Sequence, residues 1–397
     1  MRRTTAPLLL GLLLAPTLAR AGEAPDLPGA RRALERGVAW LRARQADGVW
    51  SFEMEGKSYP NPGYTALALE SVAGVLPKGA RAKDPLVAKS AAFLLSLQKE
   101  DGRLSAPGFE AYENYLTCAA LLALATVDDP AHAAAREKMK AYLLSTQRRD
   151  DQRNEGGFGY NKQRGADLSN AQFAVEALRA AGIPEDHEAM VAARRYLARL
   201  QNRSENEENE GAAWEMEVEG LGKVKVVPGD DGSAPYEPGV SKAGLEKLPD
   251  GTYVARGYGS MTYALLKCYI LAGVAKDDPR VQAAVAWLAA HYTWDENPGF
   301  AAFVRENPGS PDAPYYGLYY YYLTAAKALS LAGVATLDTP SGPRDWRRDL
   351  AAALASRQGE DGSWRNDKSP RWDEGNAVLV TAYATATLRE IVGEPAQ

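Results

Sequence analysis

A short pattern that recurs through the whole chain constrains the fold more than any other feature of the sequence. Its copies are "VAWLRARQADGVW", "AAFLLSLQKEDGRL", "KAYLLSTQRRDDQRNEGGF", "RRYLARLQ" and "AAALASRQGEDGSW". In most copies an aromatic–Leu pair precedes a Gln, and a Gly followed by a bulky apolar residue comes next. A sixth, degenerate copy, "VAWLAAHYTWDENPGF", has His291 in place of the Gln. Such self-similarity is the sequence signature of a repeat architecture.

Each copy is followed by a second run rich in Ala and Leu, such as "YLTCAALLALATV" or "YGSMTYALLKCYILAGV". The first run of each unit carries charges on one face, which is typical of a helix at a surface. The second run is nearly apolar throughout, which is typical of a helix buried on all sides. Six such helical hairpins predict an all-α fold, an α/α toroid of two concentric rings. An open solenoid is the alternative, but it needs solvated faces on both layers and capping repeats.

The segments "FLLSLQKEDGRL", "YLLSTQRRDDQRNEGGFGY" and "ALASRQGEDGSW" resemble the QW repeat of squalene and terpene cyclases, which also occurs in protein prenyltransferase beta subunits. The resemblance covers nearly all of the chain after residue 21 and implies the same α/α toroid. Exported bacterial proteins of unassigned role look similar in "GGFGY", "DLSNAQFA" and "YGSMTYALLK". One fold hosts many activities, so the repeat specifies the fold more than the function.

The N-terminus has the pattern of a secretory signal peptide. Arg2 and Arg3 precede the apolar run "LLLGLLLAP", and small residues at Ala19 and Ala21 suit a cleavage site after residue 21. We therefore expect residues 1–21 to be a signal peptide, residues 22–397 to form one toroid domain, and the protein to be periplasmic or extracellular. Cleavage would remove three arginines and take the net charge from −5 to −8.

The composition limits the partners. With 46% hydrophobic residues, 24% charged residues and a net charge of −5, the chain is an ordinary globular protein without a basic stripe. Nucleic acid is therefore not expected as a partner, and no segment after the leader is apolar enough to span a membrane. Cys118 and Cys268 lie within apolar runs and are expected to be buried, unpaired thiols.

The catalytic motifs of the related enzymes are missing. The Asp-x-Asp-Asp acid of squalene-hopene-type cyclases and the Asp-Asp-x-x-Asp metal motif of terpene synthases do not occur. Neither cysteine has an Asp two residues before it, as the zinc site of prenyltransferases requires, and the Cys-Gly-Glu-Gln motif of thioester domains is absent. We therefore expect no metal and no cofactor, and the chain leans away from being an enzyme.

Tyrosines crowd the predicted inner helices. The stretch "APYYGLYYYYLTAAKAL", from Ala313, holds six of them, and at 100° per residue all except Tyr321 fall on one broad arc. Others open the fourth inner helix. An aromatic cavity mouth of this kind could hold an apolar or isoprenoid-like ligand, with phenol groups for orientation; filling a wide barrel is the simpler alternative. The candidate ligand-binding residues are Tyr258, Tyr263, Tyr315, Tyr316, Tyr319 and Asn170.

Asp167, in "GADLSNAQ", is the one candidate catalytic residue. It stands where an Asp would cap the third inner helix, and an acid at that place would also face the barrel mouth. If the protein is an enzyme, it would act on an isoprenoid, in the manner of terpene cyclases or prenyltransferases, or on a polysaccharide, as lyases and hydrolases of this fold do. Paired acids would carry that second chemistry.

A long insertion at residues 202–256 breaks the repeat period. "KVKVV" and "GTYVA" within it are short strand candidates. Because the insertion joins the end of an outer helix to the start of an inner one, we expect it at the cavity opening, as a rim or lid. Loops of this length are usually functional or mobile, and this one could also bind a protein partner, which would make the protein a scaffold.

Overall fold

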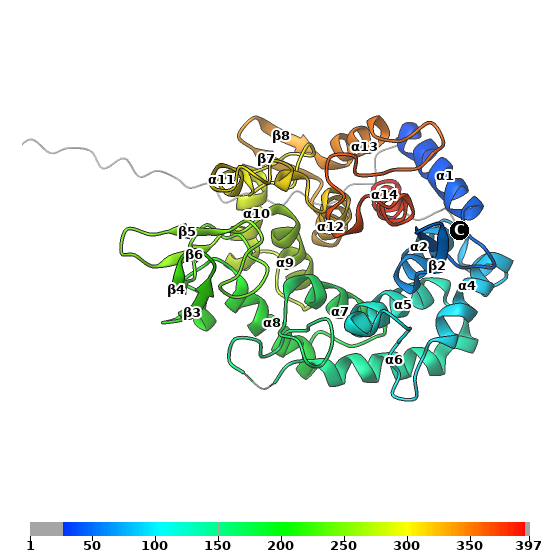
Figure 1. The fold of residues 1–397 in the computed structure, drawn as a ribbon, viewed down its shortest axis with the longest axis horizontal. Coiled ribbons are helices and arrows are strands. Elements are labelled where there is room, and N and C mark those ends of the chain that lie inside the picture. Colours follow the sequence, from blue (N-terminus) through cyan, green and yellow to red (C-terminus); the bar gives the residue numbers. More distant parts are fainter. Residues whose placement is uncertain (1–26, 150, 394–397) are drawn as a thin grey trace, which may run out of the picture.

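The computed structural model describes residues 27–149 and 151–393, which form two concentric rings of helices (Figure 1). The predicted signal peptide lies outside the described residues. The outer helices are α1 (Pro28–Ala43), α4 (Pro85–Ser96), α6 (Ala133–Thr146), α8 (Glu188–Leu200), α10 (Pro279–Ala290) and α13 (Trp346–Ser356). The inner helices are α2 (Pro62–Gly74), α5 (Glu113–Val127), α7 (Leu168–Ala180), α9 (Gly259–Leu271), α12 (Leu318–Ala332) and α14 (Ala377–Val392).

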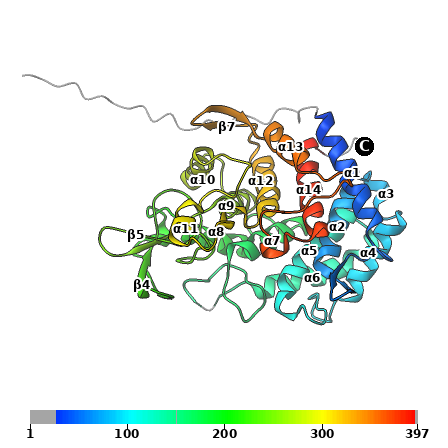
Figure 2. The same ribbon diagram turned by 45° about the horizontal axis from the view of Figure 1, so that its top comes forward.

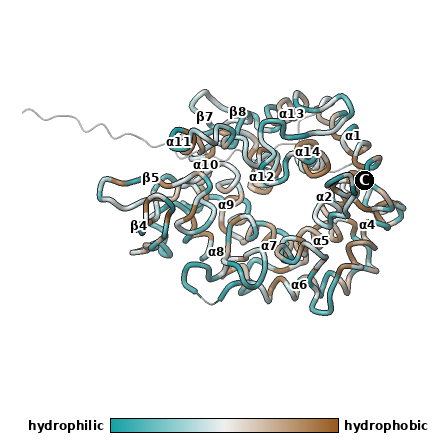
Figure 3. The backbone as a smooth tube through the Cα atoms, in the orientation of Figure 1, coloured by the Kyte–Doolittle hydropathy of each residue, from teal (hydrophilic) through white to brown (hydrophobic). Residues whose placement is uncertain are grey.

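The inner helices form a closed ring. In the order α2, α5, α7, α9, α12 and α14 each packs against the next, and α14 packs back against α2 (Figure 3). Each outer helix connects to the inner helix that follows it in the chain, so the chain makes six hairpins as the repeats predict. In the inner helix α2 every residue is buried, whereas the outer helix α1 buries only one face. The predicted all-α toroid is therefore confirmed.

The repeated Gln joins neighbouring hairpins. Gln147 Nε2 donates to the carbonyl oxygen of Gly156 in its own loop and to that of Ala189 at the start of the next outer helix. Gln98, Gln201 and Gln358 make the same two bonds at their own positions. The bond to the loop glycine gives its carbonyl a partner, and the second bond ties the loop to a helix carbonyl that already accepts from the N–H one turn further on. The repeat thus encodes the contact between units as well as the hairpin.

The first and last hairpins meet where the ring closes. Gln358 Nε2 donates to the carbonyl oxygen of Ala33 in α1 at 2.9 Å, and α1 packs along α14. Gly37 permits this packing, because a Cβ there would lie 2.6 Å from the side chains of Thr385 and Trp364. The closure therefore uses the same Gln contact as the junctions formed by Gln98, Gln147 and Gln201.

The insertion adds a small sheet outside the helical rings. Strands β3 (Trp214–Val218), β4 (Gly222–Val227), β6 (Tyr253–Ala255) and β5 (Leu245–Lys247) follow in that spatial order, with β4 and β6 parallel and the other pairs antiparallel. The two predicted strands lie in β4 and β6. The sheet projects from the edge of the ring beside α8 (Figures 1 and 2), and it buries a small core of its own around Val224, Val226 and Ala255.

Shorter elements complete the loops. They are the hairpins β1 (Ser51–Met54) with β2 (Lys57–Pro60) and β7 (Thr336–Thr339) with β8 (Gly342–Asp345), and the short helices α3 (Lys78–Arg81) and α11 (Ala301–Glu306). The loop between α10 and α12 contains α11 and is tied to the insertion, because Arg256 Nη1 bonds the Glu306 carboxylate at 2.7 Å. Across the described ranges, no helix has the length and apolarity needed to cross a membrane.

Candidate functional site

The inner helices expose one narrow stripe each towards the axis of the ring, which we call the lumen. On α2 the exposed fraction is 6% at Leu67 and 7% at Glu70, against 0% at Leu69. On α12 it is 6% at Leu323 and 7% at Lys327. Outer helices and ring neighbours cover every other face, and the stripe recurs every three or four residues, so these side chains line the lumen.

Four aromatic rings surround the axis near the inner-helix starts, and we call them the collar. They are Tyr115 of α5, Phe173 of α7, Tyr320 of α12 and Tyr383 of α14. Ring centroids are 4.6 Å apart between Tyr115 and Phe173, 6.4 Å between Phe173 and Tyr320, and 6.2 Å between Tyr320 and Tyr383. The hydroxyls of Tyr383 and Tyr115 lie 3.3 Å apart and close the circuit. Burial raises the phenol pKa of Tyr115 and Tyr320 well above the usual value, so both stay neutral.

A polar group holds one ring of the collar in place. The Tyr320 hydroxyl lies 3.1 Å from Ser169 Oγ and accepts a hydrogen bond from Gln172 Nε2. Ser169 and Gln172 belong to α7, and α9 stands between α7 and α12 in the ring, so these bonds cross the lumen face of α9. Gln172 is 1% exposed, and its Oε1 has no hydrogen-bond partner. A buried acceptor without a partner is rare in a folded protein.

Charged side chains meet further along the lumen, and we call them the base cluster. Glu176 bonds Lys267 Nζ at 2.6 Å and Lys327 Nζ at 2.7 Å. Glu70 lies 3.4 Å from Lys327 Nζ and 3.1 Å from Arg389 Nη2. Lys327 follows the collar residue Tyr320 by seven positions, about 10 Å along a helix. The lumen thus runs from an aromatic end to an ion-paired end.

The positive and negative side chains of the base cluster stabilise one another in their ionised forms. Burial disfavours the ionised form of Glu176, but the neighbouring Lys267 and Lys327 ammonium groups outweigh it and lower its pKa to about 2. The same carboxylates overcome the burial of Lys327 and raise its pKa. Glu390 of α14 lies nearby, and burial raises its pKa. The cations of this cluster are therefore paired with carboxylates of the protein itself.

Asp167 caps α7 beneath the insertion. Its Oδ1 accepts from the backbone N–H of Asn170 at 2.9 Å, and its Oδ2 accepts from Asn170 Nδ2 at 2.8 Å. Burial raises the pKa of this carboxyl to about 7, and the nearby Glu237 contributes in the same direction. Tyr236 of the insertion covers it, since its carbonyl oxygen accepts from the N–H of Leu168. Asp167 and Asn170 thus form a helix cap at the lumen mouth.

The predicted arc of tyrosines on one helix is wrong at its start. Helix α12 begins at Leu318, so Tyr315 lies in a separate 3-10 turn and Tyr316 lies before the helix. Gly317 interrupts the chain with φ +61°, and the ring of Trp372 packs against it. The carboxylate of the buried Glu374 caps α12, because it accepts hydrogen bonds from the backbone N–H groups of Tyr319 and Tyr320 in the first turn.

The other predicted tyrosines pack against neighbouring aromatic rings. Tyr263 stacks on Trp294, with centroids 6.5 Å apart, and Tyr319 contacts Tyr322 at 5.4 Å. Tyr258 packs against Phe300 at 5.1 Å. These rings fill the space between the inner helices and the loops outside them. Ligand binding by the predicted residues stays a prediction, and the structure brings a different set, the collar, to the axis.

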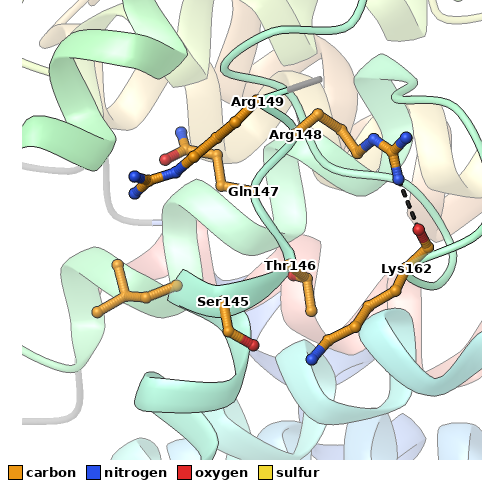
Figure 4. Close-up of a pocket in the computed structure, with 7 residues that line it drawn as sticks. Ser145, Thr146, Gln147, Arg148, Arg149 and Lys162 are labelled. Carbon is orange, nitrogen blue, oxygen red and sulfur yellow. Dashed lines mark hydrogen bonds between the residues drawn. The ribbon is translucent and has the colours of Figure 1, made fainter. Parts of the chain in front are cut away.

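Two open hollows lie elsewhere on the described surface. One, of about 430 Å³, is lined by Leu144–Arg149 and Lys162 (Figure 4). There Arg148 Nη1 donates to the carbonyl oxygen of Lys162, and Arg149 pairs with Glu188 at 3.1 Å. The other, of about 320 Å³, lies between the start of the insertion and the start of α10. In the part of the chain that the structure describes, no group of three or more His, Cys, Asp or Glu side chains is placed to hold a metal ion.

Comparisons with known proteins agree with this architecture. Residues 87–201 match the family model of the squalene-hopene cyclase N-terminal domain. The type II terpene cyclase MstE from Scytonema, in its apo form, aligns with a TM-score of 0.52 at 16% identity, over 91% of this chain and 98% of that chain. A variant of that enzyme in complex with geranylgeranyl dihydroxybenzoate, its substrate, aligns with a TM-score of 0.51 at 14% identity, over 92% and 97%. No curated protein matches the sequence.

The fold therefore defines a terpene-cyclase-like toroid. Residues 87–201 are similar to the squalene-hopene cyclase N-terminal domain, and the fold is similar to that of the terpene cyclase MstE, as the QW repeats predict. At these identities the likeness to solved structures is one of fold, and the chemistry must come from the residues of this chain.

The sequence analysis missed the collar and the base cluster. For the base cluster a signal exists in the sequence, because Glu70, Lys267 and Lys327 are the single charges of nearly apolar helices, and Glu176 shares its helix with one other charge, Arg179. Each stands on the lumen stripe of its helix. For the collar the signal is weaker. The sequence has twenty tyrosines, and which three of them lie in the collar becomes clear only from the arrangement of the helices in the ring.

Proposed function

We propose that this protein is an exported binding protein that holds an apolar, isoprenoid-like chain in its lumen. The observation that carries the proposal is the lumen stripe between collar and base cluster, where Leu67, Leu122 and Leu323 from three different helices each keep 6% exposure inside the ring. An apolar wall of this kind is the usual lining of a small-molecule site. The complex of MstE with a geranylgeranyl substrate supports an isoprenoid as the occupant.

The test is native mass spectrometry of the protein without residues 1–21, titrated with the C15 hydrocarbon farnesene. We expect a one-to-one complex in the wild type. Ala386→Leu fills the lumen stripe of α14 and should weaken binding at least tenfold. The control is Leu331→Ala, at an exposed position of α12, which should bind as the wild type does. An absence of binding, or equal binding by Ala386→Leu, would overturn the proposal and favour a scaffold that acts through its rim.

Export belongs to the same proposal and rests on the sequence of residues 1–21. Expression of the full chain in a Gram-negative host, followed by fractionation, should give a periplasmic protein whose mass corresponds to cleavage after Ala21. A protein of full mass in the cytosol would contradict it.

A second candidate function is conversion of the bound chain, with Asp167 as the proton donor. The observation in its favour is the pKa of about 7, which leaves the carboxyl partly protonated near neutral pH. Against it, both carboxylate oxygens are occupied by Asn170. Gas chromatography of lipid extracts after incubation would decide, because a product formed by the wild type and lost in Asp167→Asn requires an enzyme.

A further inference from the structure

The collar presents an unused hydrogen-bonding group to the lumen. Gln172 Oε1 has no partner although the residue is 1% exposed. Its Nε2 bonds the Tyr320 hydroxyl, so the amide is fixed at the level of the collar. If the amide were turned over, Nε2 would be the unused group instead. In either orientation one neutral amide group at the collar is left without a partner, which costs about 1–3 kcal/mol.

The electrostatic surroundings of the collar are unfavourable for an anion. Burial is the main cause that raises the phenol pKa of Tyr320 and of Tyr383, and the nearby carboxyl groups of Asp167 and Glu374 add to it in the same direction. The cations further along the lumen are no substitute, because Lys267 and Lys327 already bind Glu176. A phosphate or carboxylate at the collar would therefore meet carboxyl groups without a free cation.

We propose that the lumen ligand ends in an uncharged hydroxyl group, which bonds the Gln172 amide while its apolar chain lies along the leucines towards the base cluster. This inference rests on the proposed function and narrows it to a class, the neutral isoprenoid alcohols. A hydroxyl both donates and accepts, so it suits the amide in either orientation. The base cluster ends the apolar wall and so limits how much of the chain the lumen covers.

The experiment compares three C15 probes on the protein without residues 1–21, by native mass spectrometry or calorimetry. Farnesol should bind at least tenfold more tightly than farnesene, which lacks the hydroxyl, and than farnesyl diphosphate, which carries negative charge. In Gln172→Leu the preference for farnesol over farnesene should vanish, while the affinity for farnesene stays within a factor of about three.

The outcomes separate this inference from the proposed function. Binding of farnesene with no added affinity for farnesol would overturn the hydroxyl assignment and leave the apolar site standing, as would tighter binding of farnesyl diphosphate. Binding of none of the probes would overturn both. If Gln172→Leu does not fold, Gln172→Met serves in its place, and the ranking of the probes on the wild type remains decisive.

Discussion

Gln201, one of the repeated glutamines, shows how one side chain can join two hairpins. Gln201 is fully buried and donates to Gly232 and Arg280, and its Oε1 accepts from the Tyr269 hydroxyl at 3.1 Å. Replacing it with leucine leaves the Gly232 carbonyl and the Tyr269 hydroxyl without these partners, while the Arg280 carbonyl keeps its bond within α10. Because each unpaired buried group costs about 1–3 kcal/mol, we expect Gln201→Leu to lower the unfolding free energy by roughly 3–5 kcal/mol in urea titrations.

Gln98→Leu is the matched control for that substitution. Gln98 makes the same two backbone contacts but is only partly buried, so water can replace its bonds. We expect a loss of about 1 kcal/mol. An equal loss of unfolding free energy in Gln201→Leu and Gln98→Leu would show that burial does not determine how much the glutamine contact stabilises the fold.

Two buried carboxyls should make stability depend on pH. Burial raises the pKa of Asp167 and of Glu374 to about 7, above the ordinary 3.8 and 4.5. The native state therefore binds more protons than the unfolded state between pH 4.5 and 7, and stability falls as pH rises through this window. Each group contributes a slope of up to about 1.4 kcal/mol per pH unit.

Urea titrations at pH 5, 6, 7 and 8 would measure this slope. Asp167→Asn should remove the part of the pH dependence of stability that comes from Asp167 and leave the part that comes from Glu374. Glu176 does not affect the slope in this pH range. Its pKa is about 2 in the native state, so its stabilising effect is fully present above pH 4.5 and is lost only at lower pH. A stability that rises from pH 5 to pH 8 would refute the assignment.

At the scale of elements, the start of α12 depends on a glycine and on a distant loop. Gly317 has φ +61°, and a Cβ there would lie 2.9 Å from the Trp372 ring. Gly317→Ala should therefore cost about 1–2 kcal/mol through the left-handed backbone and the contact. Thermal unfolding would measure it, with Gly309→Ala as the control, since nothing lies within 4 Å of a Cβ there. Equal effects of the two substitutions would contradict this account.

The same element shows why part of the fold could be predicted and part could not. The hairpins follow from local patterns, because the aromatic–Leu pair, the Gln and the loop Gly act within a few residues of one another. The beginning of α12 depends on Glu374, which lies 55 residues from Tyr319, and no local pattern reveals such a cap. For this reason helix existence was predicted correctly, while the tyrosines that reach the axis were not.

The candidate site was harder to predict than the fold for a related reason. The collar takes its rings from four helices spread over the chain, from Tyr115 to Tyr383. Which face of an inner helix meets the axis depends on how the helix is rotated in the ring. A helix that is apolar on all sides has no amphipathic pattern, so its sequence does not show which face this is. Asp167 was predicted as a cap at the mouth, and the structure agrees.

At the scale of the whole molecule, the base cluster joins distant parts of the ring. Glu176→Gln would leave Lys267 and Lys327 buried with too few partners, and breaking a buried ion pair costs about 3–5 kcal/mol. The double variant Glu176→Gln, Lys267→Met should cost less than the sum of the two single losses, because it removes charge of both signs.

Chemical denaturation of the four proteins in that cycle gives the coupling energy. The exposed pair of Arg149 and Glu188 is the control, and Glu188→Gln should cost less than about 1 kcal/mol. Additive losses within the base cluster would mean that its charges act independently and do not hold the ring together.

The junction between α1 and α14 has a consequence for the order of the chain. Arg31 Nη2 of α1 lies 3.4 Å from the carbonyl oxygen of Val392 in α14, so the two ends of the described chain are neighbours. A circular permutant that links residue 393 to residue 27 and starts in the exposed loop around Gly309 should fold to the same toroid with the same helical circular dichroism. A ring in which four junctions share the same glutamine contact, the junction between the chain ends among them, has no sector that must be made first.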